Sequence, residues 1–331
     1  MLIIRPDYQL KSLNYIKNDL ILDTINPIPY HHEMMKQIGF VGLGIMGKPM
    51  ALNVLKAGYQ VKVFDIKTAP IKELVAAGAT AAPTAKDAAR GAEAVITMLP
   101  NSPEVKEAVL GKDGILEGLA PDTILIDMSS IAPLTAQEVA RAVSKKGVRM
   151  LDAPVSGGQP KAVEGALAVM VGGPQEAFDK AKKLLSAMAA SVIRVGEIGS
   201  GNTAKLCNQI IVAGNIAAMS EAMVLAAKAG VDPAQVFEAI RKGLAGSTVL
   251  EAKMPLVLAG DFRPGFRIEL HIKDLNNAAE TARELDSPAP LTARFLEMMK
   301  TLQADGKGGD DHGGLIQYYE KLAGIQVRKH T

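Results

Sequence analysis

The sequence predicts an α/β fold, with a doubly wound sheet followed by an all-helical domain. From residue 36 onward, short apolar runs alternate with helix-like stretches, which is typical of a sheet with helices on both faces. After residue 198 the apolar runs stop and only helical patterns continue. A chain of 331 residues exceeds the usual size of one domain, so we expect two.

Strands are expected where short, continuous apolar runs occur, because strands buried on both faces of a parallel sheet carry few polar residues. These runs are residues 38–41, 61–65, 94–99, 123–128, 150–153, 167–171 and 192–195. Helices are expected between them, at residues 48–57, 103–109, 135–146 and 175–188. The alternation predicts a dinucleotide-binding type of sheet over residues 36–197.

A long core helix is expected to open the second domain, which we place at residues 198–331. Residues 202–229 contain no proline and are apolar around most of the helical circumference, which is typical of a buried helix. Gly230 suits the end of this helix, and Asp232 followed by proline suits the start of the next. Further helices are expected beyond, with a loop at residues 306–314.

Residues 1–35 are expected to be a poorly ordered extension that the fold does not need. Met34 or Met35 is a natural start for the predicted sheet. The adjacent His31 and His32 have no nearby metal-ligating residues, so no metal site is predicted.

Composition excludes several classes of function. Lys and Arg number 37 against 35 for Asp and Glu, a net charge of +2, which gives no electrostatic case for nucleic acid or an anionic membrane as partner. The single cysteine, Cys207, excludes an intrachain disulfide and favours a reducing, cytoplasmic location. No continuous apolar run approaches the ~20 residues that span a bilayer.

A cofactor site is predicted by the segment Gly42-Leu43-Gly44-Ile45-Met46-Gly47, which follows a predicted strand and precedes a predicted helix. In the Rossmann fold the first glycine allows a tight turn and the second lets the backbone approach the pyrophosphate. The third lets the helix pack on the strand. The helix N-terminus also offers unpaired N–H groups to phosphates. A glycine-rich turn alone would be weak support, but this context matches the dinucleotide-binding pattern.

Asp65 ends the second predicted strand, near the spacing of ~20 residues expected of the acid that binds the adenosine ribose. Its carboxylate would repel a 2′-phosphate, so NAD(H) is favoured, while Lys67 leaves NADP(H) open. A surface acid at a strand end is the alternative. Leu99, Pro100 and Ser130 follow later strands at the edge where ligands bind. The alternative to cofactor binding is that Pro100 only terminates a strand and Ser130 only caps a helix.

Two further segments are candidates for the reacting end. Ser156, Gly157 and Gly158 offer a hydroxyl and exposed N–H groups, which suit a carboxylate. A simple turn accounts equally well for this composition. Lys205 lies one turn into the apolar helix, with Asn208 on the same face.

Lysine is rarely buried without a reason. Hydride transfer to a carbonyl builds negative charge on its oxygen, so Lys205 suits a proton donor and Asn208 an orienting group. The alternative is a lysine whose amine reaches solvent. Lys273 with Asp274 is a second candidate, although such a pair is more often a surface feature. His271 has no recognisable partner in the sequence.

Four motifs in this order resemble the β-hydroxyacid dehydrogenases over residues 36–323. They are FVGLGIMGKPMALNVLKAG at 40–58, DAPVSGGQPKAVEG at 152–165, GNTAKLCNQ at 201–209 and HIKDLNNA at 271–278. Many members carry a second asparagine where this chain has Gln209. The resemblance further implies a homotetramer or dimer that assembles through the helical domain. It also implies a set of site residues: catalytic Lys205; Ser156, Gly157 and Gly158 for the substrate carboxylate; and Leu99, Pro100, Ser130 and Lys273 for the cofactor.

Within this family, the segments TMLPNSPEVKE, LIDMSSIAP, IRKGLAGSTVLEAK and GFRIELHIKDL are most similar to members that reduce tartronate semialdehyde to D-glycerate with NAD(P)H. Members that act on 3-hydroxyisobutyrate, glyoxylate or succinic semialdehyde share the motifs and remain alternatives. A non-catalytic NAD(P)-binding sensor is a remote alternative, because such a protein would be expected to have lost Lys205.

Overall fold

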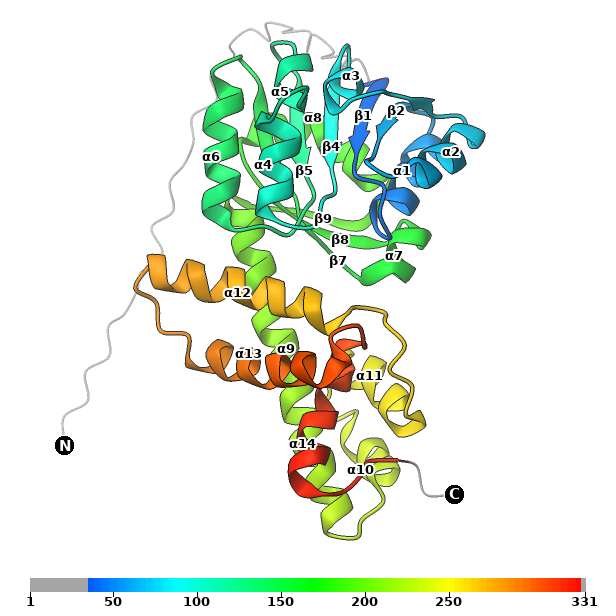
Figure 1. The fold of residues 1–331 in the computed structure, drawn as a ribbon, viewed down its shortest axis with the longest axis vertical. Helices are drawn as coiled ribbons and strands as arrows, with labels where there is room; N and C mark the ends of the chain where they lie inside the picture. The colour runs from blue at the N-terminus through cyan, green and yellow to red at the C-terminus, as the bar shows by residue number, and fades with distance from the viewer. Residues whose placement is uncertain (1–34, 329–331) are drawn as a thin grey trace, which may run out of the picture. The chain divides into compact units, whose positions relative to one another are not determined.

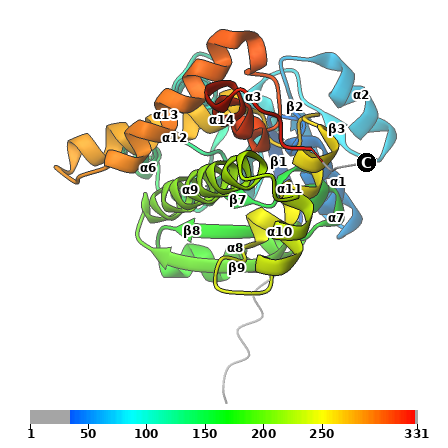
Figure 2. The ribbon, with the colours of Figure 1, turned by 90° about the horizontal axis from the view of Figure 1, so that it is seen from below.

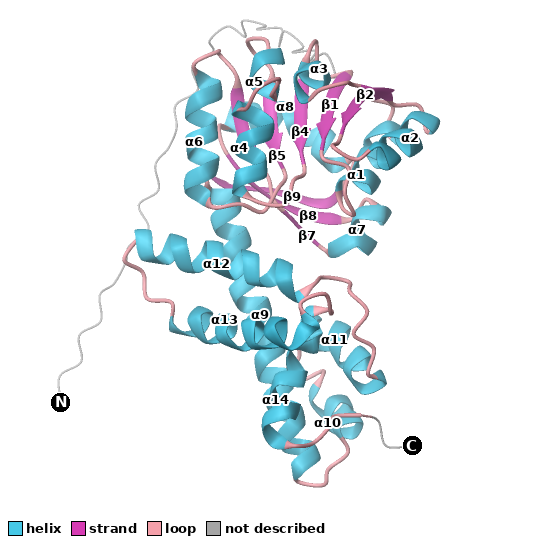
Figure 3. Ribbon diagram, viewed as in Figure 1, coloured by secondary structure: helices cyan, strands magenta, loops and turns pink. Residues whose placement is uncertain are grey.

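A mixed sheet and a set of helices make up residues 35–328, which are the residues that the computed structural model describes (Figure 1, Figure 3). The extension expected at residues 1–35, with His31 and His32, lies outside them except for Met35. The prediction of an α/β sheet followed by helices is confirmed.

The sheet has nine strands, in the order β3-β2-β1-β4-β5-β6-β8-β7, with β9 paired to β8. The first six are parallel: β1 (Gln37–Val41), β2 (Gln60–Phe64), β3 (Thr80–Ala81), β4 (Ala94–Thr97), β5 (Ile124–Asp127) and β6 (Arg149–Asp152). They are followed by β7 (Val155–Ser156), β8 (Leu167–Gly172) and β9 (Ala189–Gly196). β8 is antiparallel to β6 and β7 and parallel to β9. The two-residue strands β3 and β7 were not predicted, because they are too short to leave a pattern.

Helices cover both faces of the sheet (Figure 1), and the central strands β4, β5 and β6 are buried on both sides, whereas β3 and β9 are partly or fully exposed. In β5, Ile124 and Ile126 belong to one apolar cluster and Leu125 to the other. The predicted helices are α1 (Gly47–Lys56), α4 (Ser102–Leu110), α6 (Pro133–Ser144) and α8 (Gln175–Ser186). Sequence analysis missed α2 (Thr68–Ala76), α3 (Ala85–Ala89), α5 (Ile115–Gly118) and α7 (Gly158–Glu164). Most are too short to show a helical period, and α2 buries only Leu74.

The helical part begins at Ser200, after β9 ends at Gly196. Its helices are α9 (Ser200–Lys228), α10 (Pro233–Ile240), α11 (Thr248–Ala259), α12 (Ile268–Glu284), α13 (Pro290–Leu302) and α14 (Ile316–Ala323). The loop predicted at 306–314 was partly wrong, because short helical turns occur at η1 (Gln303–Lys307) and η2 (His312–Leu315). Asp311 caps η2 and also accepts long-range bonds from Lys253 Nζ and the N–H groups of Gly265 and Phe266, which the sequence does not reveal.

The long helix α9 contacts every other helix from α10 to α14 (Figure 2). By length and composition alone, α9 is long and apolar enough to cross a membrane, although its apolar residues do not form one continuous run. The expectation of burial on all sides was wrong. Ile211 is 62% exposed and Leu225 71% exposed, because the surrounding helices cover only part of the circumference. The homo-oligomer implied by the resemblance stays a prediction.

Asp152, at the end of β6, joins the sheet to α9. Its two carboxylate oxygens accept hydrogen bonds from the backbone N–H groups of Gly199 and Asn202, each at 2.7 Å. The side-chain oxygen of Asn202 in turn accepts the N–H of Ile131 at 3.0 Å. A carboxylate at a helix N-terminus satisfies otherwise unpaired N–H groups and interacts favourably with the helix dipole. The sheet therefore fixes the first turn of α9, one turn before Lys205.

A second buried carboxylate, Asp127, lies beside Asp152 in the parallel register of β5 and β6. Its Oδ1 accepts bonds from Thr97 Oγ1 at 2.8 Å and from the N–H of Ser129 at 3.1 Å. Its Oδ2 has no hydrogen-bond partner among the described residues. Burial raises the pKa of each carboxyl to about 6, and the charge of Asp127 further raises the pKa of Asp152.

This pair makes stability depend on pH, and Asp127→Asn should reduce that dependence. A carboxyl whose pKa is raised in the folded state stabilises the fold fully at pH values below its pKa in the unfolded chain, which is near 4. That contribution is lost as the pH rises through its folded-state pKa of about 6. Between pH 4 and 8 the variant should therefore gain about 2–3 kcal/mol in unfolding free energy relative to wild type. Urea unfolding at both pH values measures this. The exposed Asp286→Asn serves as control, and parallel pH curves for Asp127→Asn and wild type would contradict the prediction.

Candidate active site

The three glycines of the first βα turn have different surroundings. Gly42 has a φ of +92°, and a Cβ there would lie 2.4 Å from the carbonyl oxygen of Met98. A Cβ on Gly47 would lie 2.0 Å from the carbonyl oxygen of Gly42. A Cβ on Gly44 would meet nothing within 4 Å. The first and third glycines are thus required for packing, and the second leaves open space at the N-terminus of α1, which fits a pyrophosphate.

Asp65 lies beside this turn, directly after β2. One carboxylate oxygen accepts the N–H of Leu43 at 2.6 Å, and the other accepts the N–H of Lys67 at 2.7 Å. Each oxygen keeps a lone pair, since an ionised carboxylate accepts about four bonds. The arrangement leaves acceptors for ribose hydroxyls. A hollow of about 430 Å³ also borders Leu43, Gly44 and Ile45, between α1, α2 and α7.

Lys205 is buried on α9, with 6% of its surface exposed. Its Nζ donates to Gln209 Oε1 at 3.2 Å, and Asn208 Nδ2 donates to the same oxygen at 2.9 Å. Gln209 Nε2 donates to Asp274 Oδ2 at 2.6 Å. These partners fix the orientation of the amide, because a flipped amide would place N–H groups against the ammonium and an oxygen against the carboxylate.

Asp274, on α12, connects this network to the loops that follow β4 and β5. Its Oδ1 accepts bonds from Ser130 Oγ and Lys273 Nζ, each at 2.9 Å. Lys273 Nζ also donates to the carbonyl oxygens of Pro100 at 3.0 Å and Ser130 at 2.7 Å. Leu99, the residue before Pro100, donates its N–H to Ser129 Oγ at 2.9 Å. The structure therefore brings five of the predicted site residues into one hydrogen-bonded cluster, namely Lys205, Asn208, Pro100, Ser130 and Lys273.

The charges of this cluster act on one another. Burial lowers the pKa of Lys205, with Asp274 opposing the shift and Lys273 adding to it. Burial also works to raise the pKa of Asp274, but the charges of Lys273 and Lys205 outweigh it and hold that pKa below its ordinary value. Two ammonium groups and one carboxylate leave one net positive charge, which suits an anionic ligand.

The predicted carboxylate-binding residues occupy the turn from β7 to α7. Ser156 is paired with Ala168 of β8, so it ends a short strand rather than belonging to a simple turn. Gly157 and Gly158 have φ values of +134° and +67°, which favour glycine. A Cβ on Gly158 would lie 3.9 Å from the carbonyl oxygen of Gly265. This turn therefore approaches the helical part just before α12 begins.

Sequence reasoning missed Gln209 and underestimated Asp274. The Lys273–Asp274 pair was a second candidate of a kind that is more often a surface feature, but Asp274 is 1% exposed and connects both parts of the chain. The four-residue spacing of Lys205 and Gln209 places them on one helix face and was the available signal. His271, which lacked a partner in the sequence, contacts the carbonyl of Gln209 and the side chain of His312.

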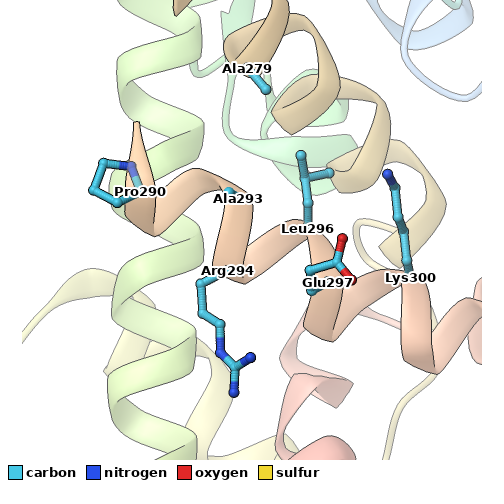
Figure 4. Close-up of a pocket in the computed structure, with 7 residues that line it drawn as sticks. All are labelled: Ala279, Pro290, Ala293, Arg294, Leu296, Glu297 and Lys300. Carbon is cyan, nitrogen blue, oxygen red and sulfur yellow. The ribbon is translucent and has the colours of Figure 1, made fainter. Parts of the chain in front are cut away.

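A separate hollow of about 400 Å³ lies between α12 and α13 (Figure 4). Figure 4 shows Leu296 and Lys300 directed toward α12 and Arg294 directed away from it. The hollow between α12 and α13 shares no lining residue with the Lys205 cluster. The full lining is Ala279, Pro290, Ala293, Arg294, Leu296, Glu297 and Lys300.

Two family models match consecutive parts of the chain. Residues 37–196 match the NAD binding domain of 6-phosphogluconate dehydrogenase, and residues 199–319 match the NAD-binding part of NADP-dependent 3-hydroxyisobutyrate dehydrogenase. The 2-hydroxy-3-oxopropionate reductase of Escherichia coli K12 is 41% identical over 288 residues, which are 87% of this chain and 98% of that protein. The chain belongs to the β-hydroxyacid dehydrogenase family. The resemblance drawn from the four motifs is thereby confirmed.

A 3-hydroxyisobutyrate dehydrogenase of this family is as similar to this chain, by sequence identity, as the reductase is. The 3-hydroxyisobutyrate dehydrogenase of Pseudomonas aeruginosa is 41% identical over 85% of this chain and 96% of its own length. The structure of Mycobacterium tuberculosis 3-hydroxyisobutyrate dehydrogenase with L-serine has a TM-score of 0.82 and 33% identity, covering 86% of this chain and 99% of that one. The family establishes a nicotinamide cofactor and an NAD(P)-dependent β-hydroxyacid dehydrogenase activity.

Two glycine variants should separate binding from packing in this dehydrogenase. Gly44→Val places its side chain in open space, so it should retain the wild-type melting temperature but weaken NADH binding at least about tenfold. Gly47→Ala meets the backbone of Gly42 and should cost about 1–3 kcal/mol of unfolding free energy. NADH fluorescence titration and thermal unfolding measure the two effects. Unchanged NADH affinity in Gly44→Val would place the pyrophosphate elsewhere.

Proposed function

We propose that this chain reduces tartronate semialdehyde to D-glycerate, with Lys205 as the proton donor. The observation that carries the proposal is the polar, net-positive cluster around Lys205, connected to the loops after β4 and β5. NAD(P)H, when bound, would supply a hydride to the aldehyde carbon and become NAD(P)⁺. Lys205 would give one proton to the carbonyl oxygen, so that the aldehyde becomes an alcohol and the neutral lysine takes a proton back from solvent.

The chain's own residues account for cofactor binding as follows. The turn from Gly42 to Gly47 holds the pyrophosphate, and Asp65 holds the adenosine ribose. Leu99, Pro100, Ser130 and Lys273 are assigned to the nicotinamide end of the cofactor. The Asp65 carboxylate favours NAD(H), and the nearby Lys67 leaves room for NADP(H).

Lys205 has the environment that a general acid at neutral pH requires. Burial lowers the pKa of its ammonium toward the operating pH, which makes proton donation easier. Gln209 Oε1 holds the ammonium in place. Asp274 stabilises the protonated form, so Lys205 keeps its proton until an alkoxide develops nearby.

The substrate carboxylate is assigned to Ser156, Gly157 and Gly158, and the net positive charge of the cluster adds attraction for an anion. Asn208 is assigned to the hydroxyl next to the aldehyde, since the amide of Gln209 already bonds Lys205, Asn208 and Asp274. A methyl group in that position would deprive the half-buried Asn208 of this partner, which costs binding free energy. This polarity favours a hydroxyl-bearing semialdehyde over the substrate of a 3-hydroxyisobutyrate dehydrogenase, although a relative of that activity is equally similar in sequence.

Lys205→Met should remove the proton donor while keeping an apolar stem of similar length. We expect kcat for tartronate semialdehyde to fall about 10²–10⁴-fold. NADH affinity should stay near wild type. Steady-state NADH oxidation and fluorescence titration measure both quantities, with Lys228→Met, an exposed lysine on the same helix, as matched control. A folded Lys205→Met enzyme with wild-type turnover would disprove the assignment.

A substrate panel tests the proposed specificity directly. Tartronate semialdehyde, methylmalonate semialdehyde, glyoxylate and succinic semialdehyde are compared with NADH and with NADPH. We expect kcat/KM for tartronate semialdehyde to exceed that of the methyl analogue at least about tenfold, because Asn208 loses its hydrogen-bond partner against a methyl group. A preference for the methyl analogue would make the chain a 3-hydroxyisobutyrate dehydrogenase. Cofactor binding without any turnover would indicate a sensor.

A further inference from the structure

Two buried histidines lie behind the Lys205 cluster, and the proposed reaction does not use them. His271 belongs to α12, and His312 begins η2. Their Nδ1 atoms are 3.0 Å apart. The ring of Phe266 packs against both, with centroid distances of 5.8 Å to His271 and 5.2 Å to His312. The pair is thus held in a dry, aromatic environment.

The contacts of this pair determine which nitrogen carries each hydrogen. His271 Nε2 is 3.0 Å from the carbonyl oxygen of Gln209, which can only accept, so this nitrogen carries a hydrogen. A neutral imidazole has one N–H group, which leaves His271 Nδ1 as an acceptor. His312 Nδ1 must then be the donor. The two rings therefore adopt opposite tautomers.

The surroundings keep both rings neutral. Burial lowers the pKa of His271 and of His312, and the charges of Lys253 on α11 and Lys205 on α9 lower both further. Asp274 on α12 opposes this for His271, while the neighbouring Asp311 is paired with Lys253 at 2.8 Å. A proton added to Nδ1 of His271 would turn two N–H groups toward each other and break the contact, whereas a proton added to Nε2 of His312 would leave it in place.

The pair is connected to the catalytic lysine through one residue. His271 and Asp274 lie on the same face of α12, three residues apart. His271 Nε2 donates to the backbone oxygen of Gln209, and Asp274 accepts a hydrogen bond from the side-chain nitrogen of Gln209. The remaining polar atom of this side chain, Oε1, contacts Lys205. Ligand-orienting histidines in metal sites are fixed by an outer hydrogen-bond partner in the same way.

We propose that His312 is a positioning residue for the reduction. Its Nδ1–H fixes His271 in the tautomer that holds Gln209, and Gln209 places the ammonium of Lys205. The inference rests on the proposed function, because it assigns His312 a role in placing the proton donor of that reaction.

Two substitutions of His312 differ in whether the donor is kept. In His312→Asn, the side-chain N–H replaces the Nδ1–H, and kcat at pH 8 should stay within about threefold of wild type. In His312→Leu the donor is lost, and kcat should fall at least about tenfold with an unchanged KM for NADH. Wild-type kcat should also fall on the acid side, where Nδ1 of His271 gains a proton. In His312→Leu this fall should move to higher pH, because the N–H that opposes protonation of His271 is lost, and in His312→Asn it should stay near the wild-type position. A purely structural role would leave the pH profile unmoved.

Histidine nitrogen NMR gives a readout that does not need turnover. The chain contains only 5 histidines, so the two buried rings are readily assigned with the variants. We expect one neutral ring with its hydrogen on Nδ1 and one with its hydrogen on Nε2. Two rings with the same tautomer would overturn the proposal, as would a folded His312→Leu variant with wild-type kcat and pH profile. Absence of turnover by the wild type with every aldehyde of the panel would instead overturn the proposed function.

Discussion

The amide of Gln209, placed between the ammonium of Lys205 and the carboxylate of Asp274, is the contact on which the candidate site depends. An amide has an accepting and a donating end, so it satisfies a cation on one side and an anion on the other. In a buried place, either end left unpaired would cost the desolvation of that group. The orientation of Gln209, and with it the place of Lys205 Nζ, is therefore determined by two charges on different helices.

The same contact connects the two parts of the chain. Asp274 accepts a hydrogen bond from Ser130, and Lys273 donates to the carbonyl of Pro100, so α12 is joined to the loops at the edge of the sheet. The N-terminus of α9 is separately fixed to β6 through Asp152. The position of Lys205 is thus determined by two attachments to the sheet. This double attachment suits a reaction in which a proton donor on one part must face a cofactor held by the other.

What the sequence could predict follows from the range of the interactions. The glycine turn was predictable because its demands are local: Gly42 needs its positive φ and Gly47 its close approach to a residue five positions away. The strands buried on both faces left continuous apolar runs. Asp274 could not be recognised, because its burial depends on Gln209, 65 positions away. His312 was likewise hidden in a glycine-rich segment and acquires its partner only when α12 packs beside η2.

The spacing of charges in the cluster also bears on the role proposed for Lys205 as an acid. A carboxylate in direct contact would strongly stabilise the ammonium and oppose proton release. The interposed amide keeps Asp274 one group away, so burial remains the larger influence on the pKa of Lys205 and Asp274 the smaller, opposing one. Lys273 takes the direct contact with Asp274 instead. The division leaves one lysine as a fixed structural cation and the other poised to give up its proton to a developing alkoxide.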